Sequence, residues 1–137
     1  MALTHLVDTS VVSRLRNADV RAVIDSLAST GRVGRAGITD LEVGYSSRNA
    51  REWDQDIDDL AVFELIETTA NHMRRARQTQ RLLASRSQRG RKIPDLLVAA
   101  AAEEAGLTLL HYDADFDLIA IVTGQHCQWV VAAGTVD

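Results

Sequence analysis

The sequence predicts an α/β fold in which a mostly parallel sheet is flanked by helices. Short apolar runs that suit buried strands alternate with longer helix-forming segments throughout the 137 residues. The chain contains a single proline, so little interrupts this alternation. Acidic residues follow the predicted strands or open the predicted helices, at the edge where α/β sheets usually carry their functional site. We therefore expect one domain over residues 1–137 with its site at that edge.

The first half of the chain begins with a short apolar strand and continues with helices and two further strands. Thr39 and Glu42 have the spacing of a capping box, which predicts that a helix begins at Thr39. Gly31 is expected to close the helical region that precedes the second strand. The predicted strands are His5–Asp8, Val33–Gly37 and Val62–Ile66, and the predicted helices are Thr9–Leu15, Val20–Leu27, Thr39–Tyr45 and Arg51–Leu60.

The second half of the chain has stronger boundary signals. Pro94 suits the start of a helix, and Gly106 suits its end. Gly124 is expected to end the last helix in the same way. The predicted helices are Thr69–Ala84, Pro94–Ala105 and Phe116–Val122, and the predicted strands are Leu107–Tyr112 and His126–Val131. In the long helix Thr69–Ala84, the residues expected to face inward are Met73, Ala76, Leu83 and Ala84.

Four acidic residues occupy strand ends or helix starts in segments that are far apart in the chain. They are Asp8, Glu42, Asp95 and Asp113. Each has a simpler explanation when taken alone, as a helix cap, half of a capping box, a favourable charge in a first helical turn, or part of a solvated loop. Together they are expected to converge on one edge of the sheet. Converging carboxylates repel one another, so this arrangement predicts a hard divalent cation and phosphoryl chemistry.

Other acid-based sites fit the sequence less well. A calcium loop beginning at Asp113 would need glycine where Leu118 stands and glutamate where Gly124 stands. A haloacid-dehalogenase-like phosphatase would need a second aspartate where Ser10 stands. The sequence also lacks a phosphate-binding GxxxxGK[ST] loop, a GxGxxG motif, a GxSxG motif and an HExxH motif. The scattered histidines are more simply explained as structural residues than as metal ligands.

Three segments of the chain resemble the PIN-domain ribonucleases of the VapC toxin type: VDTSVVSRL, ITDLEVGYSSR and IPDLLVAAAAEEAGLTLLHYDADFDLIAIVTGQ. The last segment is the most specific, while residues 50–87 contribute little to the resemblance. The resemblance implies a PIN-like α/β/α sandwich with a mostly parallel central sheet. It also implies an endoribonuclease that uses Mg²⁺ or Mn²⁺ to hydrolyse phosphodiester bonds in RNA.

The resemblance assigns roles to individual acidic residues. Asp8, Glu42, Asp95 and Asp113 match the catalytic and metal-binding positions of the family, with Asp115 as an auxiliary acid. The hydroxyl groups of Thr9 and Ser10 are candidates to hydrogen-bond these carboxylates.

One basic segment stands out in a chain whose net charge is −4. From Met73 to Lys92 there are eight basic residues and no acidic residue. Arginines on a long helix usually form a solvated face. Arg89, Arg91 and Lys92, however, directly precede Asp95, so we expect these three residues to contact RNA phosphates.

The resemblance also implies partners. A VapC-type toxin pairs with a cognate antitoxin, reaches operator DNA only through that antitoxin, and forms a homodimer. The candidate docking residues are Val11, Val12, Leu15, Ile24 and Leu27, or Leu41 and Tyr45. Core packing is the simpler explanation for most of these positions.

A second class of function stays open at this point. The same fold could serve as a weakly active or inactive binding module that holds an antitoxin and, through it, operator DNA. Four intact acidic positions favour the enzyme. The lone Cys127 and the absence of a long apolar segment predict a cytoplasmic protein without a membrane span.

Overall fold

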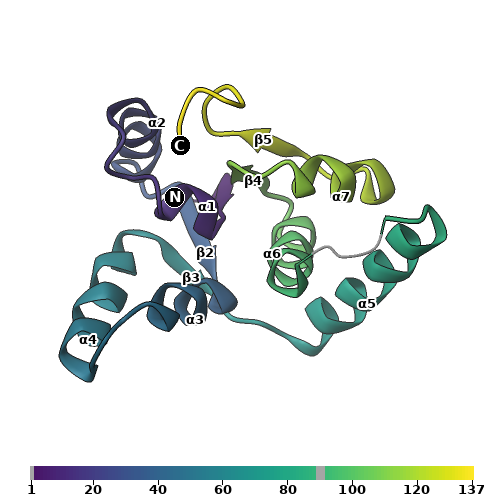
Figure 1. Ribbon diagram of the computed structural model, residues 1–137, viewed down its shortest axis with the longest axis horizontal. Coiled ribbons are helices and arrows are strands. Elements are labelled where there is room, and N and C mark those ends of the chain that lie inside the picture. Colours follow the sequence, from purple (N-terminus) through teal and green to yellow (C-terminus); the bar gives the residue numbers. More distant parts are fainter. Residues whose placement is uncertain (1, 89–91) are drawn as a thin grey trace.

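Five parallel strands form one sheet in the order β3-β2-β1-β4-β5 (Figure 1). The computed structural model describes residues 2–88 and 92–137. The central strand β1 (His5–Val7) pairs with β2 (Val33–Ala36) and β4 (Thr108–His111), while β3 (Glu64–Ile66) and β5 (Cys127–Trp129) form the edges. The predicted parallel sheet is confirmed, and each predicted strand is present in a shorter form.

Helices connect successive strands across the two faces of the sheet. In the described residues they are α1 (Thr9–Val12), α2 (Ala18–Ala28), α3 (Gly37–Tyr45), α4 (Ala50–Asp59), the 3₁₀ helix η1 (Leu60–Val62), α5 (Ala70–Ser85), α6 (Ile93–Glu104) and α7 (Asp115–Thr123). None of these helices has the length and apolar character needed to span a lipid bilayer.

Neighbouring residues of each central strand enter different hydrophobic clusters. Leu6 and Leu109 pack with buried residues of α5, α6 and α7, including Leu83, Val98 and Phe116. The next residue of each strand belongs to the other cluster, which is completed by α1, α2 and η1; the members are Val7, Leu110, Val11, Val20, Ile24 and Leu60. Because side chains alternate across a strand, the sheet separates two apolar layers. The chain therefore forms the expected α/β/α sandwich.

Two predictions about the first helices were wrong. The helix that begins at Thr9 ends at Val12, three residues before the predicted end. The helix containing Glu42 begins at Gly37, so Thr39 is inside its first turn and is not its cap. Thr39 is fully buried, and its hydroxyl has no hydrogen-bond partner among the described residues. A true capping box stands elsewhere, where Thr69 and His72 exchange hydrogen bonds at the start of α5.

The inward face of α5 was predicted only in part. Ala76 and Leu83 are buried, as expected, but Met73 is 50% exposed and Ala84 is also exposed. The polar residues His72 and Thr79 take inward positions instead. His72 can do so because its ring accepts a hydrogen bond from Thr69 N and contacts Glu104 at 3.1 Å.

A buried arginine ties β2 to the segment around η1. Arg35 forms a bidentate ion pair with Asp40, with Nε to Oδ1 at 2.6 Å and Nη2 to Oδ2 at 3.1 Å. Its Nη1 also donates hydrogen bonds to the carbonyl oxygens of Leu60 and Phe63. The guanidinium group therefore has both a charge partner and acceptors, which is the condition for placing it in the interior.

Candidate active site

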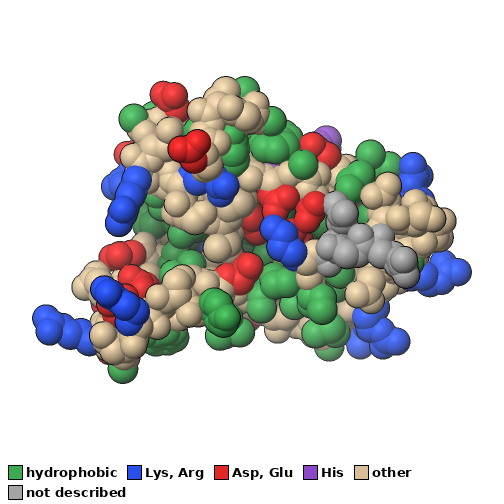
Figure 2. All heavy atoms as spheres, in the orientation of Figure 1, with side chains coloured by type: hydrophobic (Ala, Val, Ile, Leu, Met, Phe, Trp, Pro, Cys, Tyr) green, Lys and Arg blue, Asp and Glu red, His purple; other side chains and the backbone are tan. Residues whose placement is uncertain are grey.

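The four predicted acidic residues line one cavity of about 590 Å³ at the carboxyl ends of the strands. Asp8 directly follows β1, and Asp113 comes two residues after β4. Glu42 lies on α3, and Asp95 lies in the first turn of α6. Figure 2 shows acidic side chains gathered near the centre of this face. Parallel strands end at a common edge, which explains how segments separated by up to about a hundred residues meet here.

Asp8 acts as a helix cap and also presents a free oxygen. Its Oδ2 accepts a hydrogen bond from Ser10 N at 2.9 Å, so it is the N-cap of α1. Its Oδ1 is buried and has no hydrogen-bond partner among the described residues. Burial raises the pKa of Asp8 and the negative charge of Asp113 adds to this effect, although hydrogen bonds from Ser10 oppose it. The simple cap explanation is therefore correct but incomplete.

Asp95 is a second buried carboxyl group of the cavity. It is 3% exposed, and its Oδ2 has no hydrogen-bond partner within residues 2–88 and 92–137. Burial, followed by the charges of Asp8, Asp113 and Asp115, raises its pKa to about 7. Carboxylate oxygens of Asp95, Asp113 and Asp115 lie within 4.8 Å of one another. Such a group is stabilised by any cation that enters it.

The carboxylate of Glu42 accepts a hydrogen bond from a hydroxyl group on α1. Thr9 Oγ1 donates a hydrogen bond of 2.7 Å to Glu42 Oε1, which links α1 to α3. Burial raises the pKa of Glu42, and the negative charge of Asp8 acts in the same direction. Thr9 thus contacts a carboxylate, as its sequence position predicted. The Ser10 side chain also hydrogen-bonds a carboxylate, which acts to lower the pKa of Asp8, and its Oγ accepts a hydrogen bond from Tyr112 N at 2.9 Å.

Lys92 lies against the carboxylates. Its Nζ is 2.6 Å from Asp113 Oδ2, and this hydrogen bond raises the pKa of Lys92. Burial alone would raise the pKa of Asp113, but the contact with Lys92 and the hydrogen bond from Asp115 N together lower it. The other two residues predicted to bind RNA, Arg89 and Arg91, lie outside the described residues.

The side chain of His111 helps to position Asp113 by accepting a hydrogen bond from its main-chain nitrogen. The imidazole is fully buried between Phe116 and Trp129, and its Nδ1 accepts a hydrogen bond from Asp113 N at 3.2 Å. This acceptor role fixes the tautomer with the proton on Nε2. Burial lowers the pKa of His111, so the ring is neutral and its contact with Asp113 N persists at physiological pH.

The cavity also contains residues that the sequence did not point to. Arg14, Tyr112 and Trp129 line it, together with the chain end at Val136 and Asp137. Tyr112 directly precedes Asp113, which is the one signal in the sequence that could have drawn attention to it. Arg14 and the chain end gave no such signal, because their positions depend on the path of the C-terminal segment.

The donor atoms suit a hard divalent cation. The acidic residues offer only oxygen ligands, and their two buried oxygens without a hydrogen-bond partner among the described residues, Asp8 Oδ1 and Asp95 Oδ2, belong to the same cavity. Buried polar atoms are nearly always hydrogen-bonded, so their orphan state is consistent with an ion as the missing partner. The acidic cluster is thus compatible with a metal site.

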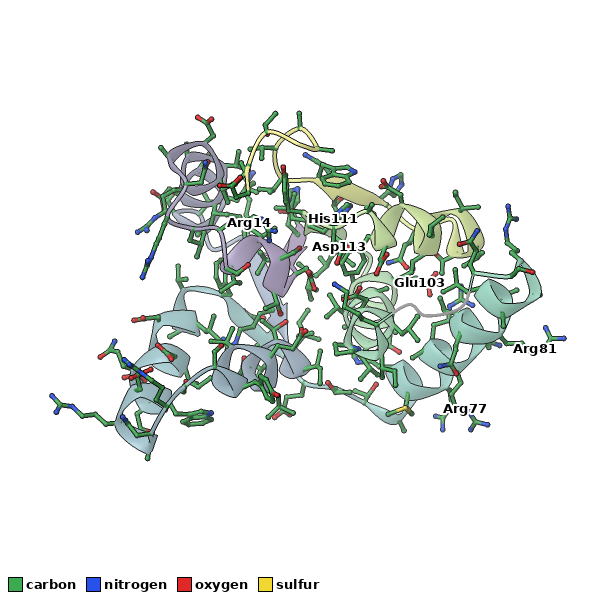
Figure 3. All side chains as sticks on the ribbon, in the orientation of Figure 1. Arg14, Arg77, Arg81, Glu103, His111 and Asp113 are labelled. Carbon is green, nitrogen blue, oxygen red and sulfur yellow. The ribbon has the colours of Figure 1, made fainter. Side chains whose placement is uncertain are left out.

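A separate cavity of about 900 Å³ lies along α5. It is rimmed by Arg74, Arg75, Arg77 and Arg81 and includes no acidic residue in its described lining. Figure 3 shows that Arg77 and Arg81 extend away from the body of the molecule, far from the labelled Asp113. Arg75 is neutralised by a bidentate ion pair with Glu103. The described lining of this cavity contains no carboxylate, thiol, hydroxyl or imidazole group.

Comparisons with known proteins agree with this architecture. The family model of the PIN domain matches residues 5–122. The chain is 64% identical over 137 residues to Ribonuclease VapC51 of Mycobacterium tuberculosis H37Rv, with 100% of both chains covered. It is 38% identical over 141 residues to Ribonuclease VapC21 of M. tuberculosis CDC 1551, covering 98% of this chain and 99% of that protein.

Solved structures provide the same fold at low sequence identity. The DNA-bound VapBC complex of Salmonella typhimurium contains a chain that matches with a TM-score of 0.76 and 16% identity, over 94% of this chain and 99% of that one. A chain of the VapBC2 complex of Rickettsia felis, bound to a promoter DNA fragment, matches with a TM-score of 0.75 and 17% identity, over 93% and 98%. Full-length identity to named relatives and the match to the family model together show that the chain belongs to the PIN domain family and, within it, to the VapC ribonucleases.

Proposed function

We propose that this chain is a divalent-metal-dependent endoribonuclease and the toxin of a toxin–antitoxin pair. The convergence of Asp8, Glu42, Asp95 and Asp113 on one cavity carries this proposal, because two of their buried oxygens lack a partner among the described residues. Membership of the VapC ribonucleases supports RNA as the substrate. The described lining of the cavity holds no serine, cysteine or histidine arranged as an activated nucleophile, which favours direct hydrolysis by water.

The acidic residues are expected to contribute to cation binding in different ways. We assign Asp8 and Asp95 as direct ligands of Mg²⁺ or Mn²⁺, with Glu42, Asp113 and the auxiliary Asp115 completing the site. When bound, the ion supplies positive charge that attracts the phosphodiester, lowers the pKa of water and neutralises the developing negative charge. Ser10 N holds Asp8, and Thr9 Oγ1 holds Glu42, so both carboxylates are oriented before the substrate arrives.

Protonation of the site sets a further condition for activity. The pKa of Asp95 is about 7 in the metal-free site, so at neutral pH a proton and a cation compete for this carboxylate. Lys92 already neutralises Asp113 and stands beside the entrance. We propose that Lys92 turns to an RNA phosphate when the cation takes its place among the acids, which agrees with the predicted role of Lys92.

We propose that the cognate antitoxin docks on the opposite side of α1. A cavity of about 600 Å³ lies there between α2, α3 and η1. Its lining includes Val12, Leu15 and Ile24, three of the residues that the sequence suggested for docking, of which Ile24 is only 3% exposed. Val11 is fully buried and belongs to the core, whereas Leu41 and Tyr45 are 65% and 93% exposed and lie outside this cavity. Charged residues also line the cavity: Arg16, Arg21, Asp25, Asp56 and Asp59. A groove that combines apolar and charged side chains suits an amphipathic helix. The lone Cys127 and the absence of a membrane-spanning helix among the described residues are compatible with a cytoplasmic location, which we include in the proposal.

The decisive experiment compares RNA cleavage by the wild-type chain with cleavage by the Asp95→Asn and Glu42→Gln variants. We expect cleavage in Mg²⁺ or Mn²⁺, none in the presence of a chelator, and none by Asp95→Asn in any condition. As a matched control, Asp54→Asn removes an exposed acid of α4 and should cleave like the wild type. Metal-independent cleavage, or full activity of Asp95→Asn, would overturn the assignment. Antitoxin binding without any cleavage would instead favour a binding module that reaches operator DNA through the antitoxin.

A further inference from the structure

Arg14 supplies a second positive charge to the carboxylate cavity. Among the described residues that line this cavity, the cationic ones are Lys92 and Arg14. Lys92 is already paired with Asp113, whereas Arg14 makes no ion pair with a side-chain carboxylate in the described part of the chain. Figure 3 labels both residues: Arg14 lies two residues after the end of α1, and Asp113 lies two residues after the end of β4, in the lining of the same cavity. Arg14 is therefore the cationic residue of this cavity that has no side-chain carboxylate partner among the described residues.

The guanidinium group of Arg14 is held in one position. Its Nη1 donates to the main-chain oxygen of Ser10 at 2.7 Å and to Ser13 Oγ at 3.3 Å. Its Nε donates to the main-chain oxygen of Asp137 at 2.8 Å. These contacts use Nε and Nη1 but not Nη2, which makes no hydrogen bond to a described residue. Two further N–H groups thus stay available for an acceptor.

An aromatic ring supports Arg14 from one side. The guanidinium carbon lies 4.8 Å from the centroid of the Tyr112 ring, within the range of a cation–π contact. The ring itself is fixed: Tyr112 N donates to Ser10 Oγ, and Tyr112 Oη exchanges hydrogen bonds with the oxygen and nitrogen of Val136. Trp129 packs edge-on against the same ring. A cation held this way loses little conformational entropy when it binds an anion.

We propose that Arg14 forms a phosphate-binding subsite for the RNA strand, next to the phosphate that is cleaved at the carboxylates. This inference rests on the proposed ribonuclease function. The planar guanidinium fork matches the oxygens of a phosphodiester. Because Arg14 shares one cavity with Asp8 and Asp113, a strand whose scissile phosphate lies at the acids passes Arg14 with a neighbouring phosphate. Arg14 thus positions the strand and does not take part in bond breaking.

A purely structural role for Arg14 explains only part of its geometry. The contacts to Ser10 and Asp137 tie the C-terminal segment to α1 through Nε and Nη1. This tie does not use Nη2, although Arg14 lines the acidic cavity and its guanidinium group stacks on Tyr112. The two roles differ in what they predict, because a structural tie does not depend on any phosphate of the substrate.

The test measures binding of a short single-stranded RNA, taken from around a mapped cleavage position, to variants in the inactive Asp95→Asn background. Arg14→Gln is compared with Arg32→Gln. Arg32 is exposed and directly precedes β2, so this control removes one charge at the amino ends of the strands, away from the cavity. We expect Arg14→Gln to weaken binding about tenfold and to reduce the salt slope by about 0.7, whereas Arg32→Gln changes neither. In the active protein, Arg14→Gln should raise KM about tenfold with little change in kcat.

A second arm replaces single phosphates of the RNA with uncharged methylphosphonates. Neutralising the phosphate that contacts Arg14 should weaken binding of the Asp95→Asn protein about tenfold and have little effect once Arg14→Gln is also present. Arg14→Lys keeps the charge and should restore the salt slope, which keeps the test decisive if the glutamine variant fails to fold. Equal slopes for Arg14→Gln and Arg32→Gln, or methylphosphonate effects that are the same with and without Arg14, would overturn the subsite. If the wild type cleaves no RNA, the proposed function fails, while the binding slopes still decide the role of Arg14.

Discussion

Lys92 Nζ lies 2.6 Å from Asp113 Oδ2, so the one lysine of the chain places its charge at the edge of an acidic cavity. As a consequence, the pKa values of the acidic residues in the cavity shift in different directions. The pKa of Asp113 is lowered, whereas the pKa values of Asp8 and Asp95 are raised. One side of the cavity is therefore neutralised by the protein itself, and the deeper side is left for a cation.

Replacing Lys92 should strengthen cation binding and weaken RNA binding. In Lys92→Met the ammonium group no longer competes for Asp113, so the affinity for Mn²⁺ measured by calorimetry should rise, by up to about fivefold for a pair this exposed. Arg77→Met, which removes an exposed charge of α5, is the control and should bind Mn²⁺ like the wild type. A weaker or unchanged affinity in Lys92→Met would mean that Lys92 does not lie in the path of the cation.

The stability of the metal-free protein should fall as the pH rises towards neutrality. The pKa of Asp95 is about 7 in the folded state and 3.8 as an ordinary carboxyl group. Between these values the folded state keeps a proton that the unfolded state has lost, so rising pH favours unfolding. In Asp95→Asn this contribution is absent. The variant should therefore gain at least about 1 kcal/mol on the wild type between pH 4.5 and pH 7.5, measured by urea unfolding with a chelator present. Parallel stability curves would contradict the raised pKa.

Local signals in the sequence were sufficient for the elements whose boundaries depend on backbone chemistry. Pro94 and Gly106 bracket α6 within two residues of its observed ends, since proline suits a first turn and Gly106 takes the left-handed conformation with φ of 69°. The helix start predicted at Thr39 was wrong because the capping-box spacing is only a local pattern. The chain instead enters α3 directly from β2 and buries Thr39 completely. Tertiary burial overrode the local signal there.

The candidate site, like the fold, was predictable only where its position follows from the sheet topology. Asp8 and Asp113 follow strands of a parallel sheet, and this topology brings strand ends together whatever the connecting segments contain. The hydrogen bond between Thr9 and Glu42 could be anticipated only as a possibility, because it depends on how α1 packs against α3. The position of the Arg14 side chain could not be predicted from the sequence. It depends on contacts with the C-terminal segment, where Asp137 accepts a hydrogen bond from Arg14 and Val136 accepts one from the neighbouring Tyr112.

Arg35 should be among the most costly residues to replace. In Arg35→Met the carboxylate of Asp40 and the carbonyl oxygens of Leu60 and Phe63 lose their donors in a largely buried setting. We expect a loss of about 3 kcal/mol in the free energy of unfolding. The double variant Arg35→Met with Asp40→Asn should lose less than the two single variants summed, because it leaves no uncompensated charge. Additive losses, determined by urea titration, would show that the two side chains are not coupled.

Metal should stabilise the wild-type fold through Asp8. A cation present at about 100 times its dissociation constant adds roughly 2.7 kcal/mol to the free energy of unfolding. Mg²⁺ or Mn²⁺ should therefore raise the melting temperature of the wild type and of Asp54→Asn, but much less that of Asp8→Asn, which lacks the unpartnered carboxylate oxygen. Equal shifts in all three proteins, followed by calorimetry or circular dichroism, would argue against a cation at this position.

Thr9 should affect activity through Glu42 alone. Thr9→Val keeps the shape of the side chain and removes the hydroxyl that holds Glu42 Oε1 at 2.7 Å. Loss of such a partner behind a metal-binding carboxylate typically costs about 10-fold to 100-fold in metal affinity or activity, so Thr9→Val should fall in this range while Thr9→Ser stays near the wild type. In a Glu42→Gln background the Thr9→Val change should have little additional effect on metal affinity, because the carboxylate that Thr9 orients is gone. A Thr9→Val protein that binds metal and cleaves RNA normally would show that Glu42 needs no support from α1.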